Sequence, residues 1–302
     1  MARQLMVQPH FLHLTTQAVG SPKFGPVIAV MIGEEKEKVI PLRKNRASTG
    51  FLRSKVSRDG FVPLINWRSM CGRYRLTAKE RYIRDHFGLD DDPPWMPRWN
   101  IAPTQQIATI RQHRSEPKRI FGLMRWGLIP YWAKDPSIGL KTINAMSETA
   151  AEKPAFRDAM RGRRCLIPAD GFYEWKRLGS KEKQPYNFGM ADDSPFAFAG
   201  LWERWQDRDD KIIETCTILT TKPNSLVADV HDRMPVILSA EDYDLWLDPG
   251  VTDSTVFTNC LKPFDPRLMR KYAISARVNR VENDDEYCAR EIAIANTTPT
   301  LF

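Results

Sequence analysis

The sequence predicts an α+β fold in which short strands dominate. Three segments, 119–129, 196–202 and 215–221, are rich in β-branched and aromatic residues and have the length of strands. Helical signals are few and short. Strands and helices do not alternate as in a parallel βαβ protein, so we expect a mixed architecture with irregular connections.

The first expected helix begins in segment 77–80. Thr77 and Glu80 have the spacing of a capping box, Ile83 and Phe87 fall on one helical face, and Gly88 can end the helix. This predicts a short helix with one buried face.

Prolines interrupt the chain after this helix, at positions 93, 94, 97 and 103. Residues 98–104 are therefore expected to form a loop with extended pieces. The three strands follow, and two further helix starts are expected, one at 239–242 and one where Asp265 precedes a proline.

The composition is typical of a soluble globular protein. Of 302 residues, 42% are hydrophobic, and no stretch approaches the roughly 18 apolar residues that span a bilayer, which excludes an integral membrane protein. The five cysteines are odd in number and lack CxxC spacing, so we expect neither a disulfide scaffold nor structural zinc. A reducing, cytoplasmic location follows, with nucleoid association in a bacterium.

The net charge of +8 is concentrated at the beginning of the chain. Residues 1–69 hold 11 Lys and Arg against 4 Asp and Glu, whereas the remainder holds 34 against 33. We expect a basic, poorly ordered extension over 1–69, a domain over 70–290 and a tail over 291–302. The extension is either a nucleic-acid-binding tail, an unstructured addition or a segment upstream of a true start at Met70.

Cys71 is a candidate nucleophile because it follows a methionine. Removal of Met70 leaves an α-amine beside a thiol, with ordinary pKa values of about 7.7–8.0 and 8.5. The amine can condense with an aldehyde, and the thiol can then close a thiazolidine ring. The alternative for a single cysteine is a small buried hydrophobic residue.

Six sequence motifs surround and follow this cysteine in a characteristic order. They are Cys71-Gly72-Arg73-Tyr74, Trp99-Asn100-Ile101-Ala102-Pro103-Thr104, Arg125-Trp126-Gly127-Leu128-Ile129-Pro130, Asn144-Ala145-Met146-Ser147-Glu148-Thr149, Pro168-Ala169-Asp170-Gly171-Phe172-Tyr173-Glu174-Trp175 and His231-Asp232-Arg233-Met234-Pro235. Together they resemble the SOS response-associated peptidase (SRAP) family of abasic-site processing proteins. The resemblance implies a single β-rich domain, with short, mostly antiparallel strands in a barrel-like core and flanking helices.

The resemblance also implies a catalytic set of Cys71, Asn144, Glu174 and His231. Cys71 matches the cysteine that links to the ring-opened sugar of an abasic site. The other types suit that chemistry, because an asparagine can hold the amine or sugar oxygen while a carboxylate and a histidine move protons. Each also has a structural alternative: His231 as an ordinary core or surface residue, Glu174 as a solvent-facing strand residue, and Asn144 as a turn or cap.

A path for single-stranded DNA is the second expectation, since such binders combine a positive groove with aromatic stacking surfaces. The candidates for phosphate contacts are Arg73, Arg125, Arg157 and Arg233, those for stacking or wedging are Trp126 and Trp132, and Pro103 and Thr104 match cleft-lining positions of the family. The alternatives are solvated surface charges and core tryptophans. Met146 stands where family members commonly carry arginine, so we expect somewhat weaker, less salt-sensitive DNA binding.

The sequence therefore predicts a monomeric protein that captures abasic sites in single-stranded DNA through Cys71, with self-processing peptidase and AP-lyase side activities. Because Cys71 is internal, cutting of the Met70–Cys71 bond or a start at Met70 must come first. The alternatives are a cysteine peptidase acting on other proteins and a non-catalytic single-strand-binding module. No membrane partner, metal or organic cofactor is expected.

Overall fold

The computed structural model describes residues 72–113, 115–179 and 182–293, all within one unit that spans Val62–Phe302. The expected extension 1–69, the nucleophile candidate Cys71 and most of the expected tail 291–302 lie outside the described residues. The domain boundaries therefore stay predictions.

Five strands close into a barrel. Strand β10 pairs in parallel with β4 and antiparallel with β9, and β4, β3, β6 and β9 complete the ring through antiparallel pairs. The barrel strands are β3 (Gln106–Gln112), β4 (Arg119–Trp126), β6 (Arg164–Ala169), β9 (Phe196–Gln206) and β10 (Ile212–Thr221). Three short strands extend this sheet: β5 (Asn144–Met146) and β11 (Met234–Pro235) on β10, and β12 (Ile237–Leu238) on β9.

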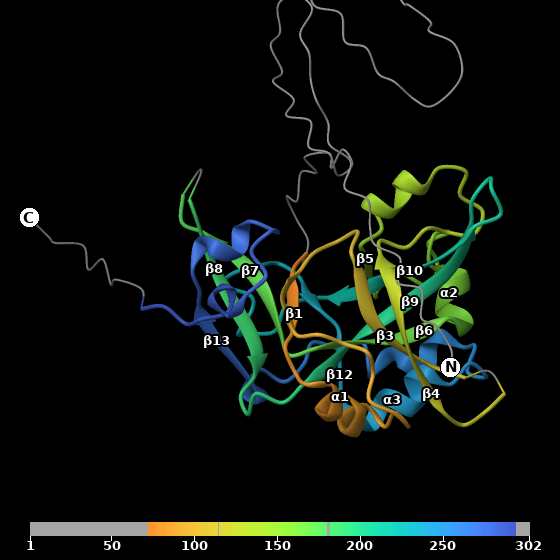
Figure 1. The fold of residues 1–302 in the computed structure, drawn as a ribbon, viewed down its shortest axis with the longest axis horizontal. Helices are drawn as coiled ribbons and strands as arrows, with labels where there is room; N and C mark the ends of the chain where they lie inside the picture. Colours follow the sequence, from red (N-terminus) through yellow and green to blue (C-terminus); the bar gives the residue numbers. More distant parts are fainter. Residues whose placement is uncertain (1–71, 114, 180–181, 294–302) are drawn as a thin grey trace, which may run out of the picture. The chain divides into compact units, whose positions relative to one another are not determined.

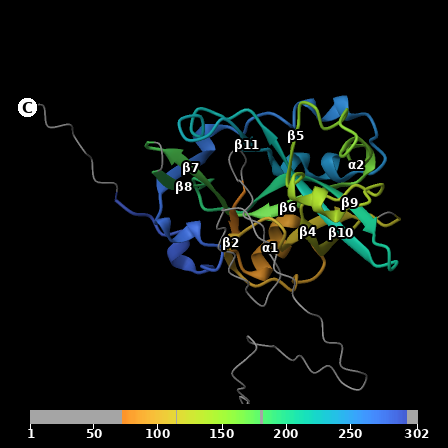
Figure 2. The same ribbon diagram turned by 90° about the horizontal axis from the view of Figure 1, so that it is seen from above.

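A second, five-stranded sheet lies beside the barrel, and Figures 1 and 2 show the two sheets next to each other from both directions. Its antiparallel order is β13 (Met269–Ala273), β8 (Lys183–Met190), β7 (Gly171–Arg177), β1 (Tyr74–Leu76) and β2 (Arg98–Ile101). The chain passes from barrel to second sheet at Asp170, whose carboxylate pairs with Arg75 at 2.8 Å. The expected β-rich α+β fold with a barrel-like core is confirmed.

The helices are short and flank the strands. They are α1 (Glu80–Phe87), α2 (Arg157–Gly162) and α3 (Tyr243–Leu247), with 3₁₀ turns η1 (Pro136–Leu140), η2 (Ala240–Asp242), η3 (Ser254–Thr258), η4 (Pro266–Leu268), η5 (Ala276–Asn279) and η6 (Glu286–Cys288). Within the described part of the chain, no helix has the length and apolar character needed to cross a membrane.

The first helix confirms most of its prediction. Ile83 and Phe87 are buried on one face, and Gly88 ends the helix with a left-handed φ of 61°. The capping box is wrong, because the N-cap residue is Lys79 and has no side-chain cap. The Thr77 hydroxyl instead donates to Asp170 at 2.8 Å, which ties the helix start to the junction between the sheets.

The strand predictions hold in their centres and differ at their ends. The strand expected over 119–129 ends at Trp126, because Gly127 has a φ of +127° and a Cβ there would lie 2.5 Å from the Gly139 carbonyl oxygen. Strand β2 is one of the extended pieces expected within the loop 98–104. The elements that follow the expected helix starts at 239–242 and at Asp265 are 3₁₀ turns. The Asp265 carboxylate caps the second turn by accepting from the Arg267 N–H at 2.9 Å.

Candidate functional site

Glu174 is a buried carboxylate on strand β7. Its neighbour Phe172 packs in the main core, and alternate residues of a strand share a face, so Glu174 also faces the barrel. Only 2% of Glu174 is exposed, which contradicts the alternative of a solvent-facing strand residue.

His231 is brought to Glu174 by a turn that follows β10. The Asn224 side chain accepts hydrogen bonds from the N–H groups of Leu226 and Val227 at 3.1 Å each, and the His231 N–H donates to the Val227 carbonyl at 3.0 Å. The imidazole Nε2 then lies 3.9 Å from Glu174 Oε2. This places an acid and an imidazole from distant parts of the chain at one point.

The other ring nitrogen of His231 has partners for either protonation state. Nδ1 lies 3.1 Å from both the backbone nitrogen and the carbonyl oxygen of Arg233, and 3.2 Å from the Asp232 carboxylate. A neutral ring can accept from the Arg233 N–H while an Nε2 proton faces Glu174, and an imidazolium can donate from Nδ1 to the carbonyl. Arg233 therefore offers Nδ1 both a backbone donor and a backbone acceptor.

Asn144 is the first residue of β5 and comes from the other sheet. It is buried and lies opposite Ile218 in the parallel pair of β5 with β10. The expected catalytic set among the described residues is thus built from both sheets and from the turn that follows β10.

Arg233 is held beside the end of β5. Its guanidinium pairs with both carboxylate oxygens of Glu148, at 2.8 and 2.7 Å, and donates to the Thr220 carbonyl at 2.6 Å. The hydrogen bond from Arg233 lowers the pKa of Glu148. Thr220 lies opposite Met146 in the β5–β10 register, so this cation lies two residues along β5 from Asn144.

Arg73 is engaged by the protein itself. Its guanidinium donates to Asn100 Oδ1 at 2.8 Å, to the Val278 carbonyl at 2.7 Å and to the Asn279 carbonyl at 3.4 Å. Burial lowers the pKa of Arg73. These contacts tie the start of β1 to strand β2 and to the C-terminal segment.

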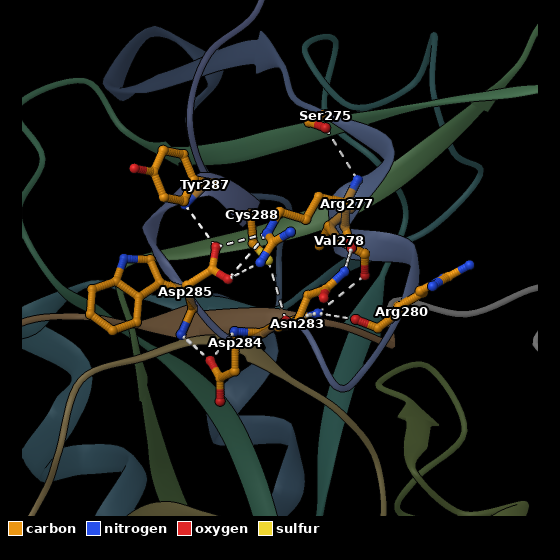
Figure 3. Close-up of polar contacts among 11 residues, drawn as sticks. Ser275, Arg277, Val278, Arg280, Asn283, Asp284, Asp285, Tyr287 and Cys288 are labelled. Atoms are coloured by element: carbon orange, nitrogen blue, oxygen red, sulfur yellow. Dashed lines mark hydrogen bonds and ion pairs between the residues drawn. The ribbon is translucent and has the colours of Figure 1, made fainter.

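That segment, 275–288, is held by hydrogen bonds and an ion pair between its own residues (Figure 3). Arg277 and Asp285 form an ion pair, and the Asn283 side chain donates to the Arg277 carbonyl at 2.8 Å. The Asp284 carboxylate accepts from the backbone N–H groups of Trp99 and Asn100, at 2.6 and 2.9 Å. The segment is therefore hydrogen-bonded to the backbone of β2.

The two tryptophans proposed for stacking differ. Trp126 is 1% exposed, donates from its indole nitrogen to the Ile143 carbonyl at 2.7 Å and packs edge-on against Tyr74. The prediction that Trp126 forms a stacking surface is wrong, because its position at the end of β4 turns the ring into the core. Trp132 is 48% exposed and remains available for a base.

The remaining DNA candidates lie at different depths. Pro103 is buried, whereas Thr104 is exposed with a φ of +73°, a strained conformation for a threonine. Arg125 is half-buried on β4, and Arg157 is exposed, 3.7 Å from Asp158. Their contacts with DNA stay predictions.

Three residues that shape the site were not singled out from the sequence. Glu148 and Asn100 stand inside motifs that were recognised, but their partners Arg233 and Arg73 are far along the chain. Asp229, which bridges two lysines near His231, carries no sequence signal beyond its position two residues before that histidine.

The cysteines of the described residues are poor nucleophiles. Cys165, Cys216, Cys260 and Cys288 are all free and buried, and burial raises the pKa of each thiol, for Cys260 to about 11. No group of three or more His, Cys, Asp or Glu in the described chain is arranged to hold a metal ion.

Fold and site together define a barrel protein in which a buried acid, Glu174 on the second sheet, meets the half-buried imidazole of His231, which follows barrel strand β10. The model of the SOS response associated peptidase (SRAP) family matches residues 70–281. The chain belongs to the SRAP family, as its motifs predict.

Relatives and solved structures agree with this assignment. Abasic site processing protein YoqW of Bacillus subtilis is 46% identical over 218 residues, 71% of this chain and 96% of that protein. Abasic site processing protein HMCES of Pongo abelii is 30% identical over 270 residues, 72% and 75% of the two chains. A crystal structure of a Bacteroides thetaiotaomicron protein superposes with a TM-score of 0.67 at 28% identity, covering 74% of this chain and 100% of the other.

Proposed function

We propose that this protein binds single-stranded DNA containing an abasic site and captures it covalently through Cys71. The observation that carries the proposal is the approach of His231 Nε2 to Glu174 Oε2, at 3.9 Å. Glu174 lies on β7, and β7 pairs with β1, the first strand of the domain. Its membership of a family whose relatives are named abasic site processing proteins supports the substrate class.

The strand register supports Cys71 as the nucleophile. Tyr74 lies opposite Phe172, and the Tyr173 N–H donates to the Arg73 carbonyl at 3.0 Å, so the antiparallel register brings Gly72 across from Glu174. Residue 71 is one peptide unit from Gly72, about 3.8 Å between Cα atoms.

The chemistry balances with water as the only leaving group. The α-amine of Cys71 adds to the aldehyde of the ring-opened deoxyribose, and the carbinolamine loses water to give an imine. Glu174 supplies the proton to the departing hydroxyl, and His231 moves the proton at the sugar's ring oxygen. The Cys71 thiol then adds to the imine carbon and its proton passes to nitrogen, closing a thiazolidine, while Asn144 holds the amine or sugar oxygen.

The reactive amine requires that the Met70–Cys71 bond be absent. When residues 1–70 precede it, the Cys71 thiol attacks the Met70 carbonyl, the peptide bond shifts to a thioester, and water hydrolyses the thioester to release the preceding segment. Glu174 or His231 moves the protons of this self-cleavage. The imine also acidifies the sugar's C2 protons, so a strand-nicking β-elimination is a side activity.

Arg233 is the phosphate contact that the geometry favours. It stands two residues from His231 and beside β5, and its guanidinium is already oriented by Glu148 and the Thr220 carbonyl. Exposed Trp132 supplies a stacking surface, and exposed Thr104 lines the path. We expect a monomer in the cytoplasm, associated with the nucleoid in a bacterium.

The test incubates the protein with a uracil-containing single-stranded oligonucleotide treated with uracil glycosylase, followed by denaturing electrophoresis and N-terminal sequencing. We expect a denaturant-stable adduct whose sugar remnant maps to Cys71, and its loss in Cys71→Ser. An adduct on a lysine, or none, refutes the proposal. Equal retention of intact and abasic strands indicates a simple binding module, and turnover of added peptides indicates a peptidase acting in trans.

A further inference from the structure

A carboxylate bridge lies beside the acid–imidazole pair. Asp229, in the turn before His231, accepts from Lys176 Nζ on β7 at 3.2 Å and from Lys271 Nζ on β13 at 2.6 Å. We call these three residues the Asp229 bridge. It connects the turn that carries His231 to two strands of the second sheet.

Two residues of the Asp229 bridge each stand two positions along the chain from a residue of the Glu174–His231 pair. Lys176 follows Glu174 by two residues on β7, so the two side chains share a face of the sheet. Asp229 precedes His231 by two residues. The ion pair therefore spans the same gap between the turn and β7 that the 3.9 Å contact of His231 with Glu174 spans.

Lys271, the second lysine of the Asp229 bridge, lies near the cross-strand neighbour of Glu174. Lys271 Nζ lies 5.6 Å from the ring centroid of Tyr186, and Tyr186 is the cross-strand neighbour of Glu174 on β8. Although partial burial opposes it, hydrogen bonds from Lys271 and Lys176 lower the pKa of Asp229, so the carboxylate is charged at neutral pH.

The rest of the turn is held from other directions. The Asn224 amide donates to the Phe264 carbonyl at 2.8 Å and lies 3.3 Å from Met269 Sδ, which fixes the beginning of the turn. Arg233, after the histidine, is tied to Glu148 and β10. The Asp229 bridge supplies the charged tie to β7 at the point where the imidazole approaches Glu174.

We infer that Asp229 is a positioning residue which, through Lys176 and Lys271, holds His231 against Glu174 for the cross-linking reaction. This rests on the proposed function. Asp229 is 49% exposed and acts through the geometry of the pair. Its removal lowers the rate of the covalent step without weakening DNA binding.

The experiment compares Asp229→Asn with Asp193→Asn in the full-length protein. Asp193 is a matched control because it is 61% exposed, pairs with Arg270 on the same strand β13 and lies at a positive φ that asparagine tolerates. Dissociation constants are measured with an intact oligonucleotide, and adduct formation is timed at saturating protein with an abasic one.

We expect Asp229→Asn to lower the saturating rate about three- to tenfold, the range that two exposed ion pairs can supply. The dissociation constant does not rise, Asp193→Asn changes neither quantity, and Asp229→Glu restores most of the rate. Equal rates in the two asparagine variants overturn the inference, as does a loss of affinity that accounts for the whole change.

A second measurement separates this inference from the proposed function. If the wild type forms no adduct, the proposed function fails, and the imidazole signals in a ¹H–¹³C NMR spectrum decide about Asp229. The His231 signal is assigned by its disappearance in His231→Ala. A shift of that signal in Asp229→Asn but not in Asp193→Asn supports positioning, and an unchanged signal overturns it.

Discussion

Replacing Asn100 by alanine should destabilise the protein strongly, because this carboxamide joins β1, β2 and the C-terminal segment. Its Oδ1 accepts from Arg73 at 2.8 Å. Its Nδ2 lies 3.2, 2.9 and 2.7 Å from the carbonyl oxygens of Val278, Arg280 and Asn283, three residues that Figure 3 labels in the C-terminal segment. Asn100 is fully buried.

The expected loss follows from the number of bonds that the amide can make. Nδ2 has two hydrogens, so at most three full hydrogen bonds exist at once, one of them to the charged Arg73. A bond to a charged group contributes roughly 1.5–3 kcal/mol and a neutral one about 0.5–1.5 kcal/mol. After the regained side-chain entropy is subtracted, the loss in unfolding free energy is about 3 kcal/mol.

Urea unfolding of the full chain measures this loss. With a slope of about 2–3 kcal/mol per molar urea, the midpoint should fall by roughly 1–1.5 M. Asn279→Ala is the matched control, because its exposed side chain makes one bond, from the Trp175 indole nitrogen at 2.7 Å, worth about 0.5–1 kcal/mol. Coinciding midpoints for the two variants would show that the Asn100 contacts do not stabilise the fold as argued.

Three further outcomes are expected. Glu174→Gln should slow adduct formation at saturating DNA about 100-fold or more while anisotropy gives an unchanged dissociation constant; an unchanged rate removes the acid role. Arg233→Gln should reduce the slope of log affinity against log salt by about 0.7, whereas Arg267→Gln, an exposed arginine paired with Asp265, should not; equal slopes contradict a phosphate contact at Arg233. The Glu148 carboxyl should titrate below its ordinary pKa of about 4.3 by ¹³C NMR, because Arg233 hydrogen-bonds to the charged form, and return upward in Arg233→Gln. The stability that the Arg233–Glu148 pair contributes is then present above the ordinary pKa of Glu148 and is lost as the pH falls through its lowered pKa in the folded protein. A Glu148 titration midpoint at the ordinary pKa would contradict this prediction.

Local patterns predicted the elements whose formation depends on neighbours in sequence. The apolar spacing of Ile83 and Phe87 and the glycine after them suffice for α1, since the helix needs only one buried face and a left-handed end. The N-cap failed because the Thr77 hydroxyl has a better-placed partner in Asp170, 93 residues away. Competition of that kind has no local signature.

The site followed the same division. The resemblance to the SRAP family implied Glu174 and His231, and the structure places their side chains 3.9 Å apart. Their catalytic roles stay predictions. The burial of Trp126 could not be predicted from its residue type, because tryptophan occurs both in cores and on surfaces. It depends on where β4 ends, which is at Trp126 itself. The bridging role of Asp229 depends on lysines from two other strands and was equally invisible.

The pairing of β5 has a consequence for biosynthesis. The strand that carries Asn144 makes its ladder bonds with β10, and the His231 turn also follows β10. The chain through Thr221 must therefore leave the ribosome before Asn144 reaches its place, and the turn through His231 must follow before the imidazole does. Pairings that distant in sequence form slowly compared with local hairpins. During translation β1 therefore emerges long before Asn144 and His231 take their places, and under the proposed function a chain released early is inert.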